Sequence, residues 1–516
     1  MSADAVVVGS GPNGLVAALL LARAGRRVLL LEGAERFGGG LRSGPLTLPG
    51  HVHDLGATVL AMALASPAFH DLGVSAAAGA PSSPERGGFA STGGPSSPEG
   101  GAAGGGFAST GGPSSSEGGG FAPLRGVEFA HPPVAAAHPL DGRPAVLVHR
   151  DPFRTAEGLG RDGAAWRAAP GAVARAGFPL VDLVLKPLGP WWAPLGTFAA
   201  AAAFGAAGLL PATTFARRAF RTVEGRAVFA GMAAHSVLDL RAPLTTGYGL
   251  LLAGLAHLVG WPLVRGGSQV LADALVAALR ELGGEAVSGH PVRRLDELSA
   301  ETIVLDVTPR QFLAMADLPP RYRRALERHR YGPGVFKLDW ALDGPVPWRD
   351  PAVAGAGTVH LGGTLEEIAL SEAEMAAGRH SPRPFVLLVQ PYAADPTRGG
   401  HTLYAYCHVP NGSAVDMTGR IEAQIERFAP GFRDRVLARH ASGPADLEAG
   451  NPNLVGGDIG GGLASLVQFL RRPVWSPAPW RTPLPGVFLC SSSTPPGGGT
   501  HGMGGWQAAR LALRGR

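Results

Sequence analysis

The feature that most constrains this chain is a glycine-rich turn between an apolar strand and an apolar helix near its start. The predicted strand covers residues 5–8, and the turn covers residues 9–14, which read Gly-Ser-Gly-Pro-Asn-Gly. The predicted helix covers residues 15–24 and ends at Gly25, and a second apolar strand follows at residues 28–31. A strand, a helix and a strand in this order form a βαβ unit, which requires a parallel sheet. The sequence therefore predicts an α/β protein.

The residues of this turn are those expected around a dinucleotide. Gly9 permits the tight turn, Gly11 lets the backbone approach a pyrophosphate, and Gly14 lets the helix pack close to the strand. Pro12 and Asn13 lie between them at the helix N-terminus, whose N–H groups and positive dipole end favour phosphate. The alternative is a glycine turn with no ligand, but the strand and helix on either side favour the dinucleotide site.

A carboxylate and a second glycine cluster follow. Glu32 ends the second strand, where a carboxylate accepts hydrogen bonds from ribose hydroxyls. Residues 36–43 then read Arg-Phe-Gly-Gly-Gly-Leu-Arg-Ser. Gly39 and Gly40 suit close passage of the backbone beside a cofactor, and Arg42 suits a place near its phosphates. An ordinary loop explains this second cluster equally well when it is taken alone.

A third glycine cluster lies near the end of the chain. Residues 486–490 predict a strand, residues 491–505 a glycine-rich loop that includes Gly498, Gly499 and Gly502, and residues 506–513 a helix. So many glycines after a strand permit close approach to a cofactor, and the helix would direct its N-terminus at a partial negative charge. The alternative is a flexible tail, but a tail would not end in an amphipathic helix.

The three clusters together resemble FAD-dependent oxidoreductases of the phytoene desaturase and amine oxidase kind. Within that kind, the likeness is to phytoene desaturase-like proteins, including the pyridine nucleotide-disulfide oxidoreductase domain-containing protein 2 group. The matching stretches are VVVGSGPNGLVAALLLARAGRRVLLLE, RFGGGLRS, GGSQVLADALVAALRELGGE, APGF at 429–432 and LPGVFLCSSSTPPGGGTHGMGGWQAAR. The resemblance implies a Rossmann-like FAD-binding domain assembled from separated segments, with an inserted α+β substrate domain.

The resemblance also implies roles for individual residues. Gly9, Gly11 and Gly14 would hold the pyrophosphate, Glu32 the adenosine ribose and Arg42 the phosphates. Val292 would lie in a strand beside the adenine, and the flavin would be lined by Gly498, Gly499, Gly502 and Met503. The chain departs from the family at Ser491, where glycine is usual, and at Pro495-Pro496, where His-Pro is usual.

The implied division of the chain has six parts. These are FAD-binding segments at 1–75, 263–310 and 456–516, substrate-domain segments at 123–262 and 311–455, and a low-complexity insertion at 76–122. In the insertion, GGFASTGGPSSPEGG at 87–101 recurs as GGFASTGGPSSSEGG at 105–119. Neither copy has an apolar face that could offset its chain entropy by burial, so a flexible surface insertion is expected.

Other predicted elements support this division. Residues 269–282 read as a helix and residues 285–295 as the edge of a strand pair, followed by a buried strand at 302–307. Alternating patterns predict antiparallel strands at 335–340, 385–390 and 403–408, and a helix is expected at 421–428.

Two long stretches without charge bear on the substrate. They cover residues 187–216 and 242–264 and are long enough to span a bilayer. Because proline, glycine and alanine dilute both, buried or substrate-facing segments are favoured over membrane-spanning helices, with docking on a membrane surface as the other alternative. A lipophilic small-molecule substrate, of which a carotenoid-like polyene is one candidate, is therefore expected.

Composition excludes several classes of partner. Charged residues make up 16% of the chain and the net charge is +5, without a basic block, so no nucleic-acid partner is expected. Cys407 and Cys490 cannot form a disulfide framework or a cysteine-based zinc site, and they fit a reducing cytosol. Neither is a convincing flavin attachment point, so FAD is expected to be non-covalent. No basic n-region precedes the first apolar run, so a cytoplasmic location, peripheral to a membrane at most, is expected.

The histidines give weaker signals. His51, His53 and Asp54 could form a metal or acid/base cluster, but no further ligand is apparent, so a structural or site-lining role is preferred and no metal is predicted. His501 lies inside the C-terminal loop. An orientation away from the substrate is favoured over one that faces it.

The sequence thus predicts an FAD-dependent oxidoreductase, of dehydrogenase, desaturase or isomerase type, that transfers hydride through the flavin. Since the flavin carries the chemistry, no catalytic side chain is predicted. One alternative is an NAD(P)-dependent dehydrogenase, because the first glycine turn and Glu32 suit NAD equally. The C-terminal glycine loop favours a flavin over that alternative. The other alternative is a non-catalytic binding protein stabilised by flavin.

Overall fold

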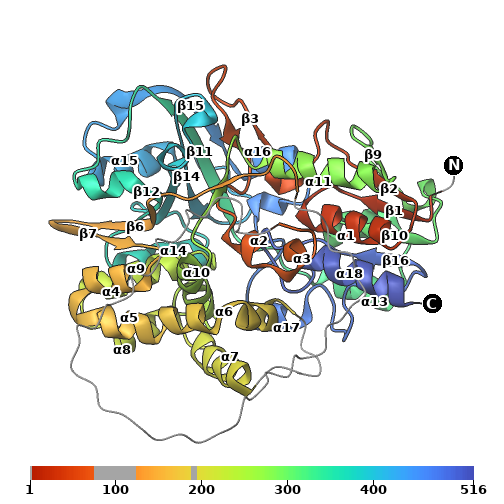
Figure 1. Cartoon of the computed structure of the whole chain (residues 1–516), viewed down its shortest axis with the longest axis horizontal. Coiled ribbons are helices and arrows are strands. Elements are labelled where there is room, and N and C mark those ends of the chain that lie inside the picture. Colours follow the sequence, from red (N-terminus) through yellow and green to blue (C-terminus); the bar gives the residue numbers. More distant parts are fainter. Residues whose placement is uncertain (1–2, 75–123, 187–194, 516) are drawn as a thin grey trace, which may run out of the picture.

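Five parallel strands carry the N-terminal glycine turn, in the order β16-β10-β1-β2-β9 (Figure 1). The structure is a computed structural model that describes residues 3–74, 124–186 and 195–515, so the predicted insertion at 76–122 lies outside the described residues. The strands are β1 (Ala5–Val8), β2 (Val28–Leu31), β9 (Glu285–Val287), β10 (Thr302–Leu305) and β16 (Val487–Leu489). All four pairings are parallel, which confirms the predicted α/β class.

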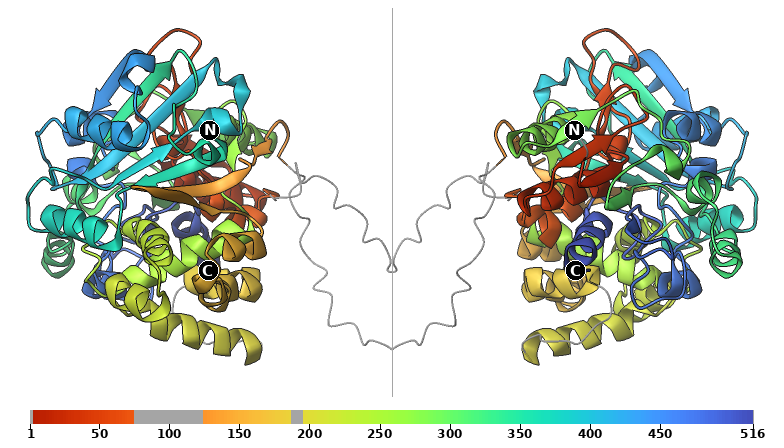
Figure 2. Two further views of the ribbon diagram at one scale, coloured as in Figure 1. Left: turned by 90° about the vertical axis from the view of Figure 1, so that its left-hand side faces the viewer. Right: turned by 90° about the vertical axis from the view of Figure 1, so that its right-hand side faces the viewer.

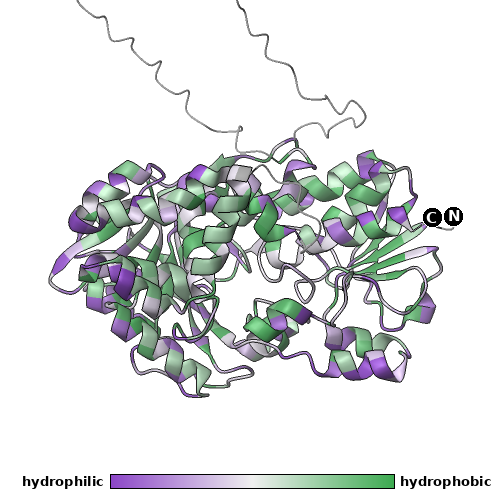
Figure 3. Cartoon of the chain, turned by 90° about the horizontal axis from the view of Figure 1, so that it is seen from below, coloured by the Kyte–Doolittle hydropathy of each residue, from purple (hydrophilic) through white to green (hydrophobic). Residues whose placement is uncertain are grey.

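Helices cover both faces of this sheet. They are α1 (Pro12–Arg23), α11 (Gln269–Glu281) and α18 (Met503–Arg514) on one face, and α12 (Pro309–Met315) and α13 (Pro320–Glu327) on the other. Side chains of β1 alternate between the two cores, with Ala5 and Val7 in the first and Val6 and Val8 in the second. The strands near the two termini are accordingly coloured hydrophobic in Figure 3. A parallel sheet buried on both faces is the Rossmann-like arrangement.

A second sheet has seven strands, in the order β15-β11-β14-β13-β12-β6-β7. Its strands are β6 (Val134–Leu140), β7 (Arg143–Val148), β11 (Gly334–Leu342), β12 (Ala356–Leu361), β13 (Val386–Val389), β14 (His401–Val409) and β15 (Val436–Ser442). The pairings are antiparallel except that of β12 with β6, which is parallel. β11, β13 and β14 confirm the three predicted antiparallel strands.

Helices also lie on both sides of the second sheet. α15 (Thr418–Phe428) packs into the core of one face, and a group of helices lies below the sheet in the left view of Figure 2. The group comprises α4 (Pro152–Gly158), α5 (Gly163–Ala168), α6 (Pro170–Leu185), α7 (Leu195–Gly208), α8 (Ala212–Ala219), α9 (Val223–Ala234), α10 (Thr245–Leu258) and α14 (Leu365–Ala376). The shorter elements are α2 (Ala61–Ala65), α3 (Pro67–His70), α16 (Pro444–Gly450), α17 (Leu466–Arg471), β3 (Ser43–Gly44), β4 (His53–Asp54), β5 (Phe129–Ala130) and β8 (Leu263–Val264).

The two uncharged stretches have different environments. The stretch at 242–264 contains α10, which is largely buried. The stretch at 187–216 contains α7, about half of whose described residues are exposed, and Phe198 at 55% is one of them. Residues 187–194 lie outside the described residues.

Within the described ranges, and by length and composition alone, one run of helix, Gly160–Leu185, is apolar enough to cross a membrane. The bent pair Gly196–Gly208 and Ala212–Ala219 would count as a second such segment if its two halves, 110° apart, formed one span. Within Gly160–Leu185, the backbone is not helical at Gly177.

Several element boundaries differ from the prediction: α1 begins at Pro12 instead of residue 15, α15 begins at Thr418 instead of residue 421, and β10 ends at Leu305 instead of residue 307. β9 ends at Val287 instead of continuing toward residue 295, because β2, its only pairing partner in the described sheet, also ends there. α18 begins at Met503, three residues before the predicted start. The early start brings Gly505 so close to α1 that an added Cβ would lie 1.8 Å from the Asn13 carbonyl oxygen. Glycine at this position therefore serves helix packing.

Candidate functional site

A cavity of about 1120 Å³ extends from the carboxyl ends of the parallel strands to the second sheet. Most of the predicted site residues line it, namely Gly9, Gly11, Pro12, Asn13, Glu32, Gly39, Gly40, Arg42, Val292, Gly498 and Gly499. Gly14, Gly502 and Met503 lie outside the lining. The three glycine clusters, which are far apart in the sequence, therefore meet around one space.

The N-terminal turn has the geometry that its glycines predict. Gly9 has φ +94°, which favours glycine, and a Cβ on Gly14 would lie 2.0 Å from the Gly9 carbonyl oxygen. Gly14 is thus a packing residue beneath the turn. α1 begins after Gly11, which has no side chain to cap the helix, and the positive dipole end favours an anionic ligand; of the first-turn amides, that of Gly14 donates to Asp306.

Glu32 is held firmly at the cavity edge. Its Oε2 accepts hydrogen bonds from the backbone N–H and the hydroxyl of Ser10, at 2.8 and 2.5 Å, and its Oε1 accepts from the Ala34 N–H at 2.9 Å. A carboxylate has about four acceptor sites, so capacity remains for a ribose hydroxyl.

Asp306, which sequence reasoning missed, lies directly behind the turn. It follows β10, its side chain is buried, and its Oδ2 accepts a hydrogen bond from the Gly14 N–H at 3.1 Å. Burial, and to a lesser degree the charge of Glu32, raises the pKa of Asp306 to about 7. Its position after a parallel strand was the available signal, since such ends face the ligand in α/β sheets.

The second glycine cluster packs against the first. A Cβ on Gly39 would lie 2.9 Å from the Gly11 Cα. Arg42 donates hydrogen bonds to the carbonyl oxygens of Gly39 at 3.1 Å and Gly450 at 2.6 Å. The cluster is therefore part of the cavity wall instead of an ordinary surface loop.

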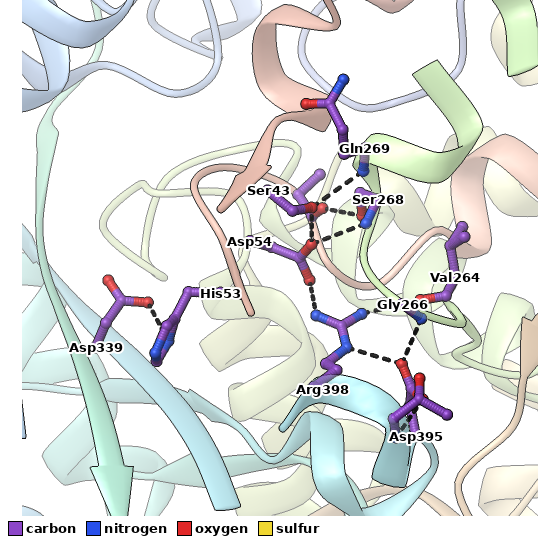
Figure 4. Close-up of polar contacts among 12 residues, drawn as sticks. Ser43, His53, Asp54, Val264, Gly266, Ser268, Gln269, Asp339, Asp395 and Arg398 are labelled. Carbon is purple, nitrogen blue, oxygen red and sulfur yellow. Dashed lines mark hydrogen bonds and ion pairs between the residues drawn. The ribbon is translucent and has the colours of Figure 1, made fainter. Parts of the chain in front are cut away.

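A buried ion-pair network supports this wall from behind (Figure 4). Arg398 is fully buried and contacts Asp54 at 2.6 Å and Asp395 at 3.0 Å. Asp54 also accepts hydrogen bonds from the Ser43 hydroxyl and the Ser268 N–H. Burial raises the pKa of Asp54, but Arg398 and these hydrogen bonds outweigh it and leave the pKa below its usual value. The network links the loop after Arg42, the start of α11 and the second sheet.

The residues His51, His53 and Asp54 do not share one set of partners in the structure. His53 contacts Asp339 and Thr47, whereas Asp54 belongs to the Arg398 network. His51 lies apart, near Gly400. Among the described residues, no group of three or more His, Cys, Asp or Glu side chains could hold a metal ion. The structural interpretation of these residues fits this geometry.

The C-terminal loop approaches the cavity with its backbone. A Cβ on Gly498 would lie 2.8 Å from the Gly460 Cα, and Gly499 has φ +128°. Gly498 therefore requires glycine for close approach of backbone, as the loop pattern predicts, and Gly499 favours glycine because of its positive φ.

The N-terminus of α18 is arranged differently from the prediction. The Met503 N–H donates to His501 Nδ1 and the Gly504 N–H donates to Asn13 Oδ1, both at 3.1 Å. Two amides that were expected to face the flavin are thus bound within the protein, because α18 packs closely on α1 and on the loop itself. His501 is buried and is not part of the cavity lining, and burial lowers its pKa to about 4.

Val292 lies at the cavity but not in a strand, contrary to the prediction. After β9 ends, Gly289 turns the chain with φ +66°, and the His290 N–H donates to the Glu32 carbonyl oxygen at 2.8 Å. Pro291 then follows, which has no N–H for a ladder hydrogen bond. Val292 therefore reaches the cavity from an extended loop beside Glu32.

The other end of the cavity is apolar and aromatic. Part of its lining comes from the uncharged stretch at 242–264, which was expected to be buried or substrate-facing, namely Tyr248, Leu251, Leu252 and Trp261. Sequence reasoning missed the other lining side chains, including Met62, His235, Leu387, Val389, Tyr404 and Tyr406. Together, these side chains come from α2, α10, β13, β14 and the segments after α9 and α10, so no local pattern could have brought them together. Cys407 and Cys490 are free and buried, and neither lines the cavity.

Comparisons with known proteins agree with this geometry. Residues 7–72 match the family model described as an NAD(P)-binding Rossmann-like domain. Two curated relatives, both named pyridine nucleotide-disulfide oxidoreductase domain-containing protein 2, come from Rattus norvegicus and Mus musculus. Each is 27% identical to this chain over 56% of its length, and the match spans 59% of each relative. The predicted resemblance to this group is confirmed.

Solved structures share the fold across nearly the whole chain. Putrescine oxidase bound to putrescine has a TM-score of 0.56 at 17% identity, covering 99% of this chain and 98% of that one. Cyclohexylamine oxidase from Brevibacterium oxydans IH-35A has a TM-score of 0.53 at 15% identity, covering 99% of both chains. These neighbours confirm the amine oxidase-like fold, and both are named as oxidases.

Proposed function

We propose that this chain is a flavin-dependent oxidoreductase that binds FAD non-covalently. The observation that carries the proposal is the cavity in which the N-terminus of α1, Glu32 and the Gly498–Gly499 backbone meet. An NAD(P) site alone would need the first two features but not the C-terminal glycine wall. The oxidoreductase names of the relatives and structural neighbours support the same class.

The residues present fit FAD at each part of the molecule. The α1 N-terminus and the Gly9–Gly14 turn would hold the pyrophosphate, with Arg42 at the cavity edge beside it. Glu32 would accept from the ribose, with Val292 against the adenine. Gly498 and Gly499 would pass beside the ring system. When bound, the flavin supplies the hydride-accepting and hydride-donating chemistry, while the protein orients the substrate and excludes water.

The substrate is proposed to be lipophilic. The support is the apolar and aromatic end of the cavity, where Trp261, Leu251 and Leu387 are among the lining residues. A cytoplasmic protein with reversible contact to a membrane would suit such a substrate. The exposed, uncharged surface of α7 supports that contact, because apolar side chains outside the core gain by entering the membrane interface.

The test is the identity and attachment of the cofactor. The purified protein should be yellow, and acid precipitation should release FAD into the supernatant. Glu32→Arg should lose most of the bound FAD, because a cation would replace the ribose acceptor at a cost of about 1–3 kcal/mol or more. Glu35→Arg, which changes an exposed carboxylate three residues away, is the control and should keep its FAD.

Other results would refute parts of the proposal. Flavin that stays on the precipitated protein would refute the non-covalent site. Unchanged FAD content in Glu32→Arg would refute the ribose assignment. A colourless protein that binds NAD(P)H would favour the dehydrogenase alternative, and bound flavin that no substrate or electron donor reduces would favour a binding protein.

A further inference from the structure

Arg472 lies in the cavity wall beneath two glycine loops. Its side chain is 3% exposed, and its Nη2 donates to the carbonyl oxygens of Gly460 at 3.2 Å and Gly462 at 3.3 Å. A Cβ on Gly497 would lie 2.6 Å from its Nη1, so the guanidinium also touches the C-terminal loop. The residue therefore lies at the junction of the 460–462 loop and the predicted flavin loop.

The guanidinium is incompletely paired. Among the described residues, its Nε has no hydrogen-bond partner, and no carboxylate oxygen lies within the 4.0 Å of an ion pair. Burial lowers the pKa of Arg472, although the neighbouring Tyr248 and Asp458 partly oppose this. An uncompensated buried charge is costly, so its presence needs a reason.

Two other charged groups of the cavity lining, Lys337 and Asp458, have partners within the protein. The Nζ of Lys337 contacts both carboxylate oxygens of Asp339 and the Asp54 carbonyl oxygen. Asp458 accepts hydrogen bonds from the Gly332 and Gly460 N–H groups, both at 2.7 Å, and burial raises its pKa. Its carboxylate oxygens are thus engaged by backbone amides, and it forms no ion pair with Arg472 within 4.0 Å.

At the α18 N-terminus, the Met503 and Gly504 amides are bound to His501 and Asn13, so these two amides are not directed at an anion in the cavity. The guanidinium of Arg472 is a positive group that contacts both glycine loops. Its planar arrangement of N–H groups matches two acceptor atoms held side by side on a planar anion.

We infer that Arg472 is an anion-binding group of this cavity that takes a planar anion with adjacent acceptor atoms. The inference rests on the proposed function. Two sources offer that chemistry. One is the flavin ring, which carries a negative charge after it accepts a hydride, and the other is the carboxylate of a small-molecule ligand.

The experiment compares three variants of the FAD-loaded protein. Arg472→Gln removes the charge, Arg472→Lys keeps the charge but loses the planar edge, and Arg471→Gln changes the exposed neighbouring arginine as a matched control. The readouts are FAD content, melting temperature, two-electron midpoint potential and the dissociation constants of sulfite and benzoate. Sulfite adds to oxidised flavin and leaves negative charge on the ring, whereas benzoate is a planar carboxylate.

If the anion is the reduced ring, Arg472→Gln weakens sulfite binding about tenfold or more and lowers the midpoint potential by about 30 mV for each tenfold loss. If the anion is a ligand carboxylate, benzoate binding weakens about tenfold with an unchanged potential. In either case Arg472→Lys loses about threefold in the same readout, and Arg471→Gln matches the wild type.

The inference is overturned if Arg472→Gln keeps its FAD and changes neither readout. If that variant does not fold, an Arg472→Lys protein with both readouts unchanged overturns it equally. Wild-type protein without flavin would refute the proposed function but not Arg472. In that case benzoate must raise the melting temperature of the wild type more than that of Arg472→Gln, and an equal effect on both would refute the anion site.

Discussion

Replacing Asp306 by asparagine should stabilise the protein at pH 8 and change its stability little near pH 4. The Asp306 carboxyl group is buried behind the glycine turn and accepts the Gly14 N–H at 3.1 Å. Asparagine can accept the same hydrogen bond with its Oδ1 but cannot ionise. The substitution therefore separates the hydrogen bond from the charge.

The magnitude follows from proton linkage. The pKa of Asp306 rises from 3.8 to about 7 on folding, so the folded state holds a proton that the unfolded state releases between these values. The free energy of unfolding consequently falls as pH rises from about 4 to about 7 and stays lower above that. A shift of about three units corresponds to a penalty of about 4 kcal/mol at pH 8, which asparagine removes.

The assay is urea unfolding of both proteins across this pH range, without added cofactor. The advantage of Asp306→Asn should be near zero at pH 4, about half-developed near pH 5.5, and complete above pH 7. Asp317→Asn, which changes an exposed carboxylate after α12, is the control and should show no such rise. A stability difference that does not change with pH, or wild-type protein that is the more stable at pH 8, would refute the reasoning.

Three other substitutions test the site and its support. Arg398→Met should lower the free energy of unfolding by about 3–5 kcal/mol in urea titration, since it leaves Asp54 buried without its cation; a loss below about 1 kcal/mol would contradict this. The Gly499→Val protein should show less flavin absorbance per protein or altered flavin reduction, because the φ of +128° at this position is strained for valine. Full flavin occupancy with an unchanged reduction potential would refute a role for this loop. Gly505→Ala should destabilise the protein by about 1–3 kcal/mol or more in the same titration, because its Cβ would meet the Asn13 carbonyl oxygen, and equal stability with a Gly515→Ala control would show that α1 and α18 can separate.

Local features were predictable because they follow from backbone stereochemistry and hydrophobic periodicity. Gly9 with its positive φ, the apolar strands β1 and β2, and Glu32 at a strand end are each determined within a few residues. The parallel sheet also followed, since a βαβ unit of this length leaves no other arrangement. Predictions for single residues near the ends of elements were less accurate, as Val292 and the start of α18 show.

Only the tertiary structure decided which distant groups meet. Asp306 lies behind Gly14, Asn13 caps α18, and Arg472 lies beneath Gly497, and these pairs are far apart in the sequence. No periodicity records such contacts, because they depend on how two sheets and the loops between them pack. The same packing removes water from Arg472 and Asp306. The pKa values of these two groups are shifted because their charges are buried, and the residue type alone does not predict that shift.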